Sequence, residues 1–314
     1  MKKVFVLILT LFIINCSLFS QAINVGVLIG PSCIPIVKMM DAKESDYKYE
    51  TFASPQNFLP KMLKDEIDIG FMPLNIAAKV FNSSNKKLLC AVICGGGNLS
   101  LITKDKKIKN LSDLKNKTVV TAGKGATPEY FIKYLLTENN IAIDEKNGVF
   151  LDFSIPTASI VPLLLSDKIK YVILPEPYST IATSKSNEVY YSIDLQDEFE
   201  KITKTTSFYP LTAIVVRSEF AINCPEKVKD FLKNYETSSD WVQENPKEAG
   251  LLCEKLQLGL DSNIVEHSIP KSNYVFRKSS DSKEEIEHLL KIFLQNDENS
   301  IGGKLPDSSF YLNW

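Results

Sequence analysis

The sequence contains little of what several classes of function require. Its 314 residues include two histidines, His267 and His288, and two arginines, Arg217 and Arg277; 36 Lys and Arg residues nearly balance 38 Asp and Glu, for a net charge of −2. Without a basic excess there is no electrostatic footprint for DNA or RNA, so we expect no nucleic-acid partner. Neither histidine has a second His or Cys at metal-ligand spacing, so we expect surface histidines and no metal site.

The motifs of common catalytic and nucleotide-binding sites are also missing. There is no Gly-x-Ser-x-Gly and no His-Glu-x-x-His. Gly303-Lys304 is followed by Leu305 rather than Ser or Thr, which excludes a P-loop. The Gly-x-Gly at 123–125 has Pro128 where a dinucleotide-binding loop has its third glycine, so we expect no cofactor. Paired carboxylates stay open as a catalytic arrangement.

Cysteine is scarce and does not indicate a disulfide framework. Outside the N-terminal run the cysteines are Cys33, Cys90, Cys94, Cys224 and Cys253. An odd number argues against a pure disulfide scaffold. Cys90 and Cys94 lie four residues apart in an apolar run that predicts a strand, too far apart to form a disulfide. We interpret them as small buried apolar residues.

No apolar run reaches the roughly 20 residues that a membrane-spanning helix needs. The run at 4–14 follows Lys2 and Lys3, and Ser20-Gln21-Ala22 supplies the small residues that a signal peptidase recognises. Residues 1–22 therefore predict an export signal and a periplasmic protein. The alternative is lipid attachment at Cys16, which would leave an exported protein anchored to the membrane.

What the sequence does contain is a repeat with a spacing of about one hundred residues. The segment 52–55 (Phe-Ala-Ser-Pro) resembles 153–156 (Phe-Ser-Ile-Pro), and the apolar run 67–73 resembles 169–175. Both apolar runs end in proline, which suits the first turn of a following helix. Strands and helices alternate, which predicts two similar α/β lobes with mainly parallel sheets. The alternative is a chance similarity, because such strands are common in α/β proteins.

Hydrophobic periodicity predicts the remaining elements. Further strands are expected at 24–28, 88–94, 99–103, 118–121 and 212–216, and helices at 34–41, 56–64, 129–137, 158–165, 226–243, 247–257 and 283–294. The runs 99–103 and 212–216 are expected to be the crossings between the lobes. Everything after Asn223 is predicted to be helical and to pack on the first lobe. The expected organisation is signal peptide 1–22, first part of lobe 1 at 23–102, lobe 2 at 103–212, and the return to lobe 1 with the C-terminal helices at 213–314.

The ends of the predicted strands indicate where a ligand binds. In an open parallel sheet, ligands bind at the carboxyl ends of strands, where loops and helix N–H groups converge. The repeat therefore predicts one cleft lined by loops from both lobes. Lobe 1 is expected to contribute Gly30, Pro31, Ser32, Ser54, Met72, Pro73 and Asn75, and lobe 2 Gly123, Lys124, Gly125, Ala126, Thr127, Thr157 and Glu176. Met72, Tyr178, Phe208 and Tyr209 are expected either as apolar walls or as core residues.

Two of these positions have both a structural and a ligand-binding interpretation. The glycines of 122–128 let the backbone approach a ligand, and a helix start offers partial positive charge to an anion, yet Thr127 can also be a simple N-cap. Glu176, between two prolines, can accept hydrogen bonds from an amine or hydroxyl of a ligand. A helix N-terminus also stabilises an acid when no ligand is present.

Together these features resemble the periplasmic solute-binding proteins of ABC importers. The phrases at 52–55, 66–70, 123–129 and 174–177 are similar to the branch that binds nitrate, sulfonates, taurine or thiamine precursors, and the resemblance covers 23–314. It implies a type II periplasmic-binding fold, with two lobes joined by a double crossover hinge, and ligand contacts from 122–128 and Glu176. An arginine is expected for a tightly held sulfonate, and neither arginine lies in the predicted loops.

The function that the resemblance implies is capture of a small solute by hinge closure. A ligand that bridges the lobes shifts the population toward the closed form. Delivery to a membrane permease driven by an ATPase, and a monomeric state, are the further expectations. The alternative is an enzyme on the same scaffold, such as a menaquinone-pathway dehydratase or a pyrimidine-precursor synthase, since a fold does not fix a function. Those substrates are cytoplasmic, so the export signal argues against both enzymes. A structural surface protein is the third class.

Overall fold

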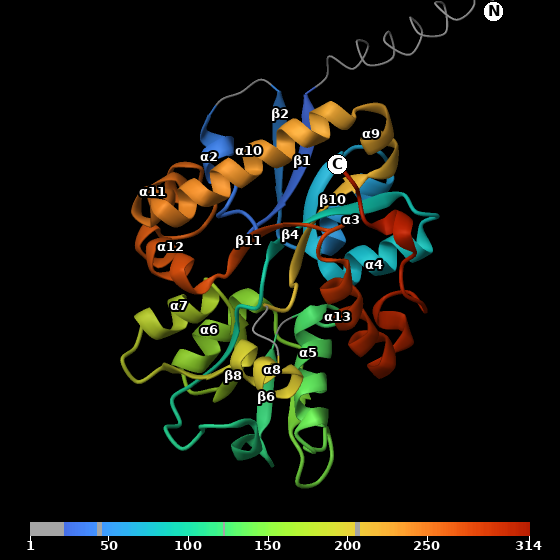
Figure 1. Cartoon of the computed structure of the whole chain (residues 1–314). Coiled ribbons are helices and arrows are strands. Elements are labelled where there is room, and N and C mark those ends of the chain that lie inside the picture. Colours follow the sequence, from blue (N-terminus) through green and yellow to red (C-terminus); the bar gives the residue numbers. More distant parts are fainter. Residues whose placement is uncertain (1–21, 43–45, 122, 205–207) are drawn as a thin grey trace, which may run out of the picture.

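In a computed structural model, two α/β lobes lie one above the other (Figure 1). The structure describes residues 22–42, 46–121, 123–204 and 208–314. The strands are β1 (Ile23–Leu28), β2 (Tyr47–Phe52), β3 (Ile69–Pro73), β4 (Leu88–Gly95), β5 (Leu99–Thr103), β6 (Thr118–Thr121), β7 (Phe150–Asp152), β8 (Tyr171–Pro175), β9 (Tyr190–Asp194), β10 (Thr212–Arg217) and β11 (Tyr274–Lys278). The helices are α2 (Val37–Asp41), α3 (Pro55–Leu63), α4 (Leu74–Ser83), α5 (Thr127–Glu138), α6 (Thr157–Leu165), α7 (Tyr178–Ser184), α8 (Leu195–Thr203), α9 (Ser218–Asn223), α10 (Pro225–Glu244), α11 (Pro246–Lys255), α12 (Ser262–Ser268) and α13 (Lys283–Asn296), with short 3₁₀ turns that include η2 (Ile269–Lys271), η3 (Glu298–Ser300) and η4 (Ser308–Phe310).

Five strands of the lobe 1 sheet have the same order and directions as the five strands of the lobe 2 sheet, which confirms the predicted repeat; β11 is an additional edge strand in lobe 1. The sheet of lobe 1 has the order β2-β1-β3-β10-β4-β11, and the sheet of lobe 2 has the order β7-β6-β8-β5-β9. In each lobe the first three strands are parallel. A strand that arrives from elsewhere in the chain, β10 or β5, is then inserted antiparallel between two others. The expected mainly parallel, two-lobed α/β fold is therefore confirmed, with both sheets mixed.

The chain crosses between the lobes just before β5 and just before β10. The run 99–103, expected to be a crossing, is a complete strand of the lobe 2 sheet, and 212–216 belongs to β10 of the lobe 1 sheet. The crossing segments are therefore the short stretches around Gly96 and Tyr209. The boundary predicted at residue 102 falls inside β5.

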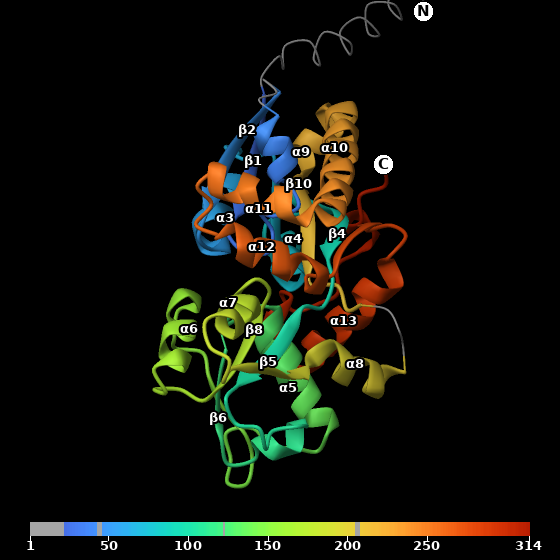
Figure 2. The same cartoon turned by 90° about the vertical axis from the view of Figure 1, so that its left-hand side faces the viewer.

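Two expectations for the C-terminal third were wrong. β11 is a strand, although everything after Asn223 was predicted to be helical; its five residues pair antiparallel with β4 at the edge of the lobe 1 sheet. The C-terminal helices were expected to pack on lobe 1, and α10 and α11 do pack against α2 there, but α13 packs against α5 of lobe 2 (Figures 1 and 2). Amphipathic spacing indicates a buried face without identifying its partner.

The apolar core forms three clusters. One contains residues of both lobes, among them Phe81, Leu101 and Phe131, together with α13. The second lies within lobe 1 under α10, α11 and α12. The third lies within lobe 2 between its sheet and α6 and α7. Only the first of these clusters therefore joins the lobes.

Several smaller expectations have a clear outcome. Cys33, Cys90, Cys94, Cys224 and Cys253 are buried free thiols, as the strand interpretation of Cys90 and Cys94 predicts. Both histidines are exposed on helices. None of the described helices has the length and apolarity needed to cross a bilayer. The predicted export signal and the lipid-attachment residue Cys16 lie outside the described residues.

Candidate functional site

The loops predicted to bind a ligand follow strands in both lobes. Gly30 follows β1 with a φ of +115° and is buried, and Pro31 and Ser32 beside it are half-buried. Ser54 is the N-cap residue of α3, and Thr157 is the first residue of α6; both are half-buried. These positions follow strands of both sheets, as the repeat predicts.

Asn75, at the start of α4, joins the two lobes directly. Its Nδ2 donates to the carbonyl oxygen of Gly125 at 3.0 Å and to that of Ser300 at 3.2 Å. Its Oδ1 accepts a hydrogen bond from the Thr127 hydroxyl at 3.2 Å. The side chain is fully buried, and its bonds to Ser300 and Thr127 are formed away from water, where an unpaired amide is costly. Asn75 therefore holds the glycine loop of lobe 2 against lobe 1.

The glycine loop of lobe 2 has the backbone freedom that its sequence predicts. Gly123 and Gly125 have φ values of +88° and +74°, a region that residues with a Cβ seldom adopt. Gly123, Lys124 and Gly125 are exposed. The N–H of Gly125 donates to Glu129 Oε2 at 2.7 Å, which ties the loop to the first turn of α5.

Thr127 is not the N-cap of α5. The cap position is Ala126, and the Thr127 hydroxyl bonds to Asn75 instead of to its own helix. Thr127 therefore neither caps its own helix nor has a hydroxyl free for a ligand. Its side chain is engaged across the boundary between the lobes.

Several helices that follow predicted ligand loops begin without a side-chain cap. The N-cap residues of α3, α4, α5 and α6 make no side-chain cap bond. Helices α9, α10, α11 and α13 also lack one, so this feature is not special to the predicted ligand loops. In α7, the Thr180 N–H of the first turn donates to Glu176. The dipole at a helix start favours an electronegative group.

Glu176 is engaged by its own lobe. Its Oε1 accepts a hydrogen bond from the Tyr191 hydroxyl at 2.6 Å, and its Oε2 accepts one from the Thr180 N–H at 3.2 Å. The side chain is 2% exposed, and burial raises the pKa of this carboxyl, opposed by the bonds from Tyr191 and Thr180. The structural interpretation of Glu176, an acid that satisfies the start of α7, is the one that these bonds favour.

Sequence reasoning missed the lobe 1 side of this network. Lys271, at the end of η2, donates to the Tyr191 hydroxyl at 3.3 Å and stands 4.5 Å from the centre of its ring. Asn98, between the crossing glycines and β5, is 7% exposed, and its Oδ1 has no partner among the described residues. No motif marks either residue; the only signal was the closeness of Asn98 to Gly95-Gly96-Gly97 in the sequence.

Other expected wall residues are in different positions. The ring of Tyr178 lies next to Gly30 of lobe 1: a Cβ atom built on this glycine would be 3.7 Å from the ring. Met72 is fully buried in the lobe-joining core cluster and has no surface to offer a ligand. Tyr209 is also core: its ring centre lies 3.8 Å from that of Phe131. Phe208, beside it, keeps 37% of its surface exposed.

Neither arginine is available to a ligand at this boundary. Arg217 pairs with Asp68 at 2.9 Å and also with Asp65 and Glu219. Arg277 pairs with Glu285 of α13. No group of three or more His, Cys, Asp or Glu residues suited to a metal ion occurs in the described part of the chain.

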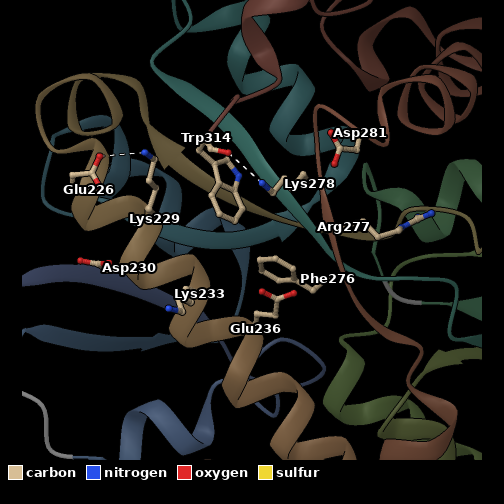
Figure 3. A pocket seen from close by; sticks show the side chains of 10 residues that line it. All are labelled: Glu226, Lys229, Asp230, Lys233, Glu236, Phe276, Arg277, Lys278, Asp281 and Trp314. Carbon is tan, nitrogen blue, oxygen red and sulfur yellow. Dashed lines mark hydrogen bonds and ion pairs between the residues drawn. The ribbon is translucent and has the colours of Figure 1, made fainter.

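A groove of about 760 Å³ lies elsewhere, on the outer surface of lobe 1 (Figure 3). One wall is the polar face of α10, from Glu226 to Glu236, and the other carries Phe276 and Trp314. Charged side chains of both signs line it, and none of the predicted ligand residues does. It is an open surface groove without the convergent buried polar groups typical of a binding site.

Comparison with known proteins adds a family and a fold. A family model described as NMT1-like matches residues 21–257. No curated protein matches the chain. Among solved structures, an ABC transporter from Parabacteroides distasonis is similar with a TM-score of 0.77 and 22% identity, over 94% of this chain and 99% of that one.

Two further structures are similar at lower identity. The periplasmic aliphatic sulphonate binding protein SsuA from Escherichia coli has a TM-score of 0.70 and 13% identity, over 94% of each chain. The periplasmic nitrate-binding protein NrtA from Synechocystis has a TM-score of 0.67 and 12% identity, over 90% of this chain and 84% of that one. At such identities the likeness shows a shared fold.

Proposed function

Because the chain belongs to the NMT1-like family, we propose that it is the solute-binding component of an ABC uptake system. The observation that carries the proposal is that loops at the carboxyl ends of strands from two lobes of similar topology meet across one boundary, where Asn75 after β3 bonds to Gly125 and Thr127 after β6. A solute at this boundary is in contact with both lobes at once. Proteins of the same fold are named as ABC transporter, sulphonate-binding and nitrate-binding proteins, which supports this role.

The proposed mechanism is closure of the lobes on a bridging solute. A solute that contacts Ser32 and Ser54 of lobe 1 and the 123–127 loop and Thr157 of lobe 2 has more partners in the closed form than in the open one. Its differential affinity for the closed form is what shifts the population. We propose that the closed form docks on a membrane permease with its ATPase, as a monomer, and that the chain is exported, either free in the periplasm or anchored through Cys16.

The chemistry of the boundary favours an organic solute over a simple oxyanion. Guanidinium groups hold sulfonates and similar anions with two parallel hydrogen bonds, and both arginines are paired elsewhere. Lys124, in the exposed glycine loop, and Lys271, bonded to Tyr191, are two cationic side chains near the boundary. Asn98 Oδ1 and the Ser and Thr hydroxyls offer acceptors for N–H or O–H groups. We propose a small organic molecule with hydrogen-bond donors, and an anion as the second possibility.

The competing function is an enzyme on the same two-lobed scaffold. The buried carboxyl of Glu176 and the Tyr191 hydroxyl form an acid pair at the boundary between the lobes that could carry proton transfer. Each is already bonded to its neighbours, and Glu176 is 2% exposed, so binding without chemistry is the better supported function.

A thermal-shift screen of the purified protein tests the proposal. The panel contains nitrate, bicarbonate, alkylsulfonates, taurine, pyrimidines, thiamine, riboflavin, amino acids and menaquinone precursors. A ligand at 100 times its dissociation constant adds about 2.7 kcal/mol of stability. We expect a stabilising compound that mass spectrometry recovers unchanged. A stabilising compound recovered in altered form would contradict the binding function and support the enzyme.

A further inference from the structure

The C-terminal segment joins the two lobes a third time, besides the two crossings. Helix α13 buries Ile286, Leu289, Leu290, Ile292 and Phe293. These side chains belong to the core cluster that also contains lobe 2 residues of α5, and the rings of Tyr130 and Phe293 lie 5.6 Å apart. In Figure 1, α13 and α5 lie side by side on the right of the molecule, and they are in contact.

Polar bonds fix the same edge. The Tyr130 hydroxyl of lobe 2 donates to Asp297 Oδ2, just after α13, at 3.1 Å. Burial, together with this carboxylate, raises the pKa of Tyr130 to about 12. The buried amide of Asn75 adds bonds to Gly125 and Ser300, so α4, the glycine loop and η3 meet at one side chain.

The rest of the segment is attached to lobe 1. Asn82 of α4 donates from Nδ2 to the carbonyl oxygens of Ile301 and Lys304, both at 2.7 Å. The Phe310 ring packs edge-on against Phe81, and the N–H of Leu312 donates to Cys90 of β4. Residues 283–312, which we name the C-terminal strap, therefore hold lobe 2 at one end and lobe 1 at the other.

The opposite edge of the boundary is built differently. There α7 of lobe 2 meets α12 and the Gly30 loop of lobe 1, on the left in Figure 1. The core cluster beneath α12 stops within lobe 1, and the one beneath α7 stops within lobe 2, so no described cluster crosses here. The polar contact that crosses is the bond from Lys271 to Tyr191, and the lysine is exposed.

We propose that the strap is a fixed edge and that lobe 2 opens about it, so that the α7–α12 edge separates while the α5–α13 edge stays closed. Separating the α5–α13 edge would expose apolar surface and leave the Asn75 and Asp297 partners unpaired. Separating the α7–α12 edge breaks the exposed Lys271–Tyr191 bond and moves α7 away from α12 and the Gly30 loop, but it opens none of the described core clusters, so it costs less. Together with the proposed function, the solute then enters past Tyr178 and Lys271. The fixed edge itself does not depend on any solute.

Distances between paired spin labels test this asymmetry without a ligand. In a Cys16→Ser parent, exposed residues are replaced in pairs: Lys185→Cys with His267→Cys across the α7–α12 edge, and Thr137→Cys with His288→Cys across the α5–α13 edge. The native described thiols are buried and leave the introduced ones to react. We expect a broad distance distribution for the first pair and a single narrow one for the second. Distributions of equal width, narrow or broad, would overturn the proposal.

A conservative variant tests the strap itself. Tyr130→Phe keeps the ring against Phe293 and removes the hydrogen bond to Asp297. The matched control is Tyr134→Phe on the same helix, whose ring packs against Phe199 within lobe 2. We expect Tyr130→Phe to broaden the distribution of distances between the spin labels at positions 137 and 288. Tyr134→Phe should leave this distribution unchanged. An unchanged distribution in Tyr130→Phe would overturn the assignment of this bond to the fixed edge.

Discussion

Asn75 of lobe 1 and Gly125 of lobe 2 are joined by a hydrogen bond of 3.0 Å, from the amide Nδ2 to the carbonyl oxygen. The two residues are fifty positions apart, each in the segment that follows a strand carboxyl end of its own lobe. Both were expected at a ligand site. The bond shows that the two residues position each other, because it fixes the glycine loop of lobe 2 against α4 of lobe 1.

Asn75→Ala should loosen the glycine loop. The change leaves the Thr127 hydroxyl and the Ser300 carbonyl without their bonds from this side chain, at a cost of about 1–3 kcal/mol in the free energy of unfolding. Hydrogen exchange should then accelerate at Gly125, Ala126 and Glu129. The control is Asn82→Ala on the same helix, which also loses two bonds to carbonyls but only within lobe 1. Equal exchange in the two variants would contradict the positioning role.

Gly125→Ala should strain the loop without a clash. The backbone has a φ of +74°, and a Cβ placed there has no heavy atom within 4 Å, so the cost is conformational, roughly 1–2 kcal/mol. Gly303→Ala is the matched control, because it combines a φ of +86° with equally open space, far from the boundary loops in the sequence. Both variants should lose similar stability in urea denaturation. Only Gly125→Ala should weaken binding of a solute found in the screen.

Tyr191→Phe and its neighbour Tyr190→Phe should differ in stability. Tyr191 donates to the buried Glu176 carboxylate, and its loss leaves that oxygen unpaired, at a cost of about 1–3 kcal/mol. The buried Tyr190 hydroxyl has no partner in the described structure, so its removal should be neutral or slightly stabilising. Urea denaturation of both variants measures the difference. Equal losses would show that the Tyr191–Glu176 bond contributes nothing to stability.

Glu176→Gln should change the pH dependence of stability. Burial raises the pKa of this carboxyl above its unfolded value, so the folded protein holds the proton more tightly. Stability is therefore lost as the pH rises through the usual carboxyl range toward the raised pKa. Relative to Glu176→Gln, the wild type should lose free energy of unfolding as the pH rises above the ordinary pKa of a glutamate. The exposed Glu138→Gln is the control, and parallel curves for wild type and Glu176→Gln would contradict the expected direction.

Much of the fold could be predicted because the repeat consists of short sequence patterns, such as apolar runs that end in proline. The apolar runs that end at Pro73 and Pro175 identify equivalent strands, and β1, β5 and β6 have nearly the predicted limits. β11 could not be predicted in this way, because its five residues form a strand only by pairing with β4 at a sheet edge. For α13, the spacing of its apolar residues predicts the helix but not that α5 is its partner.

The candidate site was predicted at the level of loops and less well at the level of side chains. Asn75, Thr127 and Gly125 lie together as expected, because parallel strands place their carboxyl ends at one edge. Met72 and Tyr209 are core residues, which is the second of their two interpretations, because residues near strand ends can point into the core as readily as toward a ligand. Lys271 and Tyr191 are eighty residues apart and meet only through the tertiary fold.

A crystal structure of the protein with a compound that stabilises it tests the central claim most directly. The account predicts the unmodified compound between the lobes, in contact with the 30–32 loop or Ser54 on one side and with 123–127 or Thr157 on the other. Density in the groove between α10 and Trp314, or a compound held by one lobe alone, would contradict capture between the lobes.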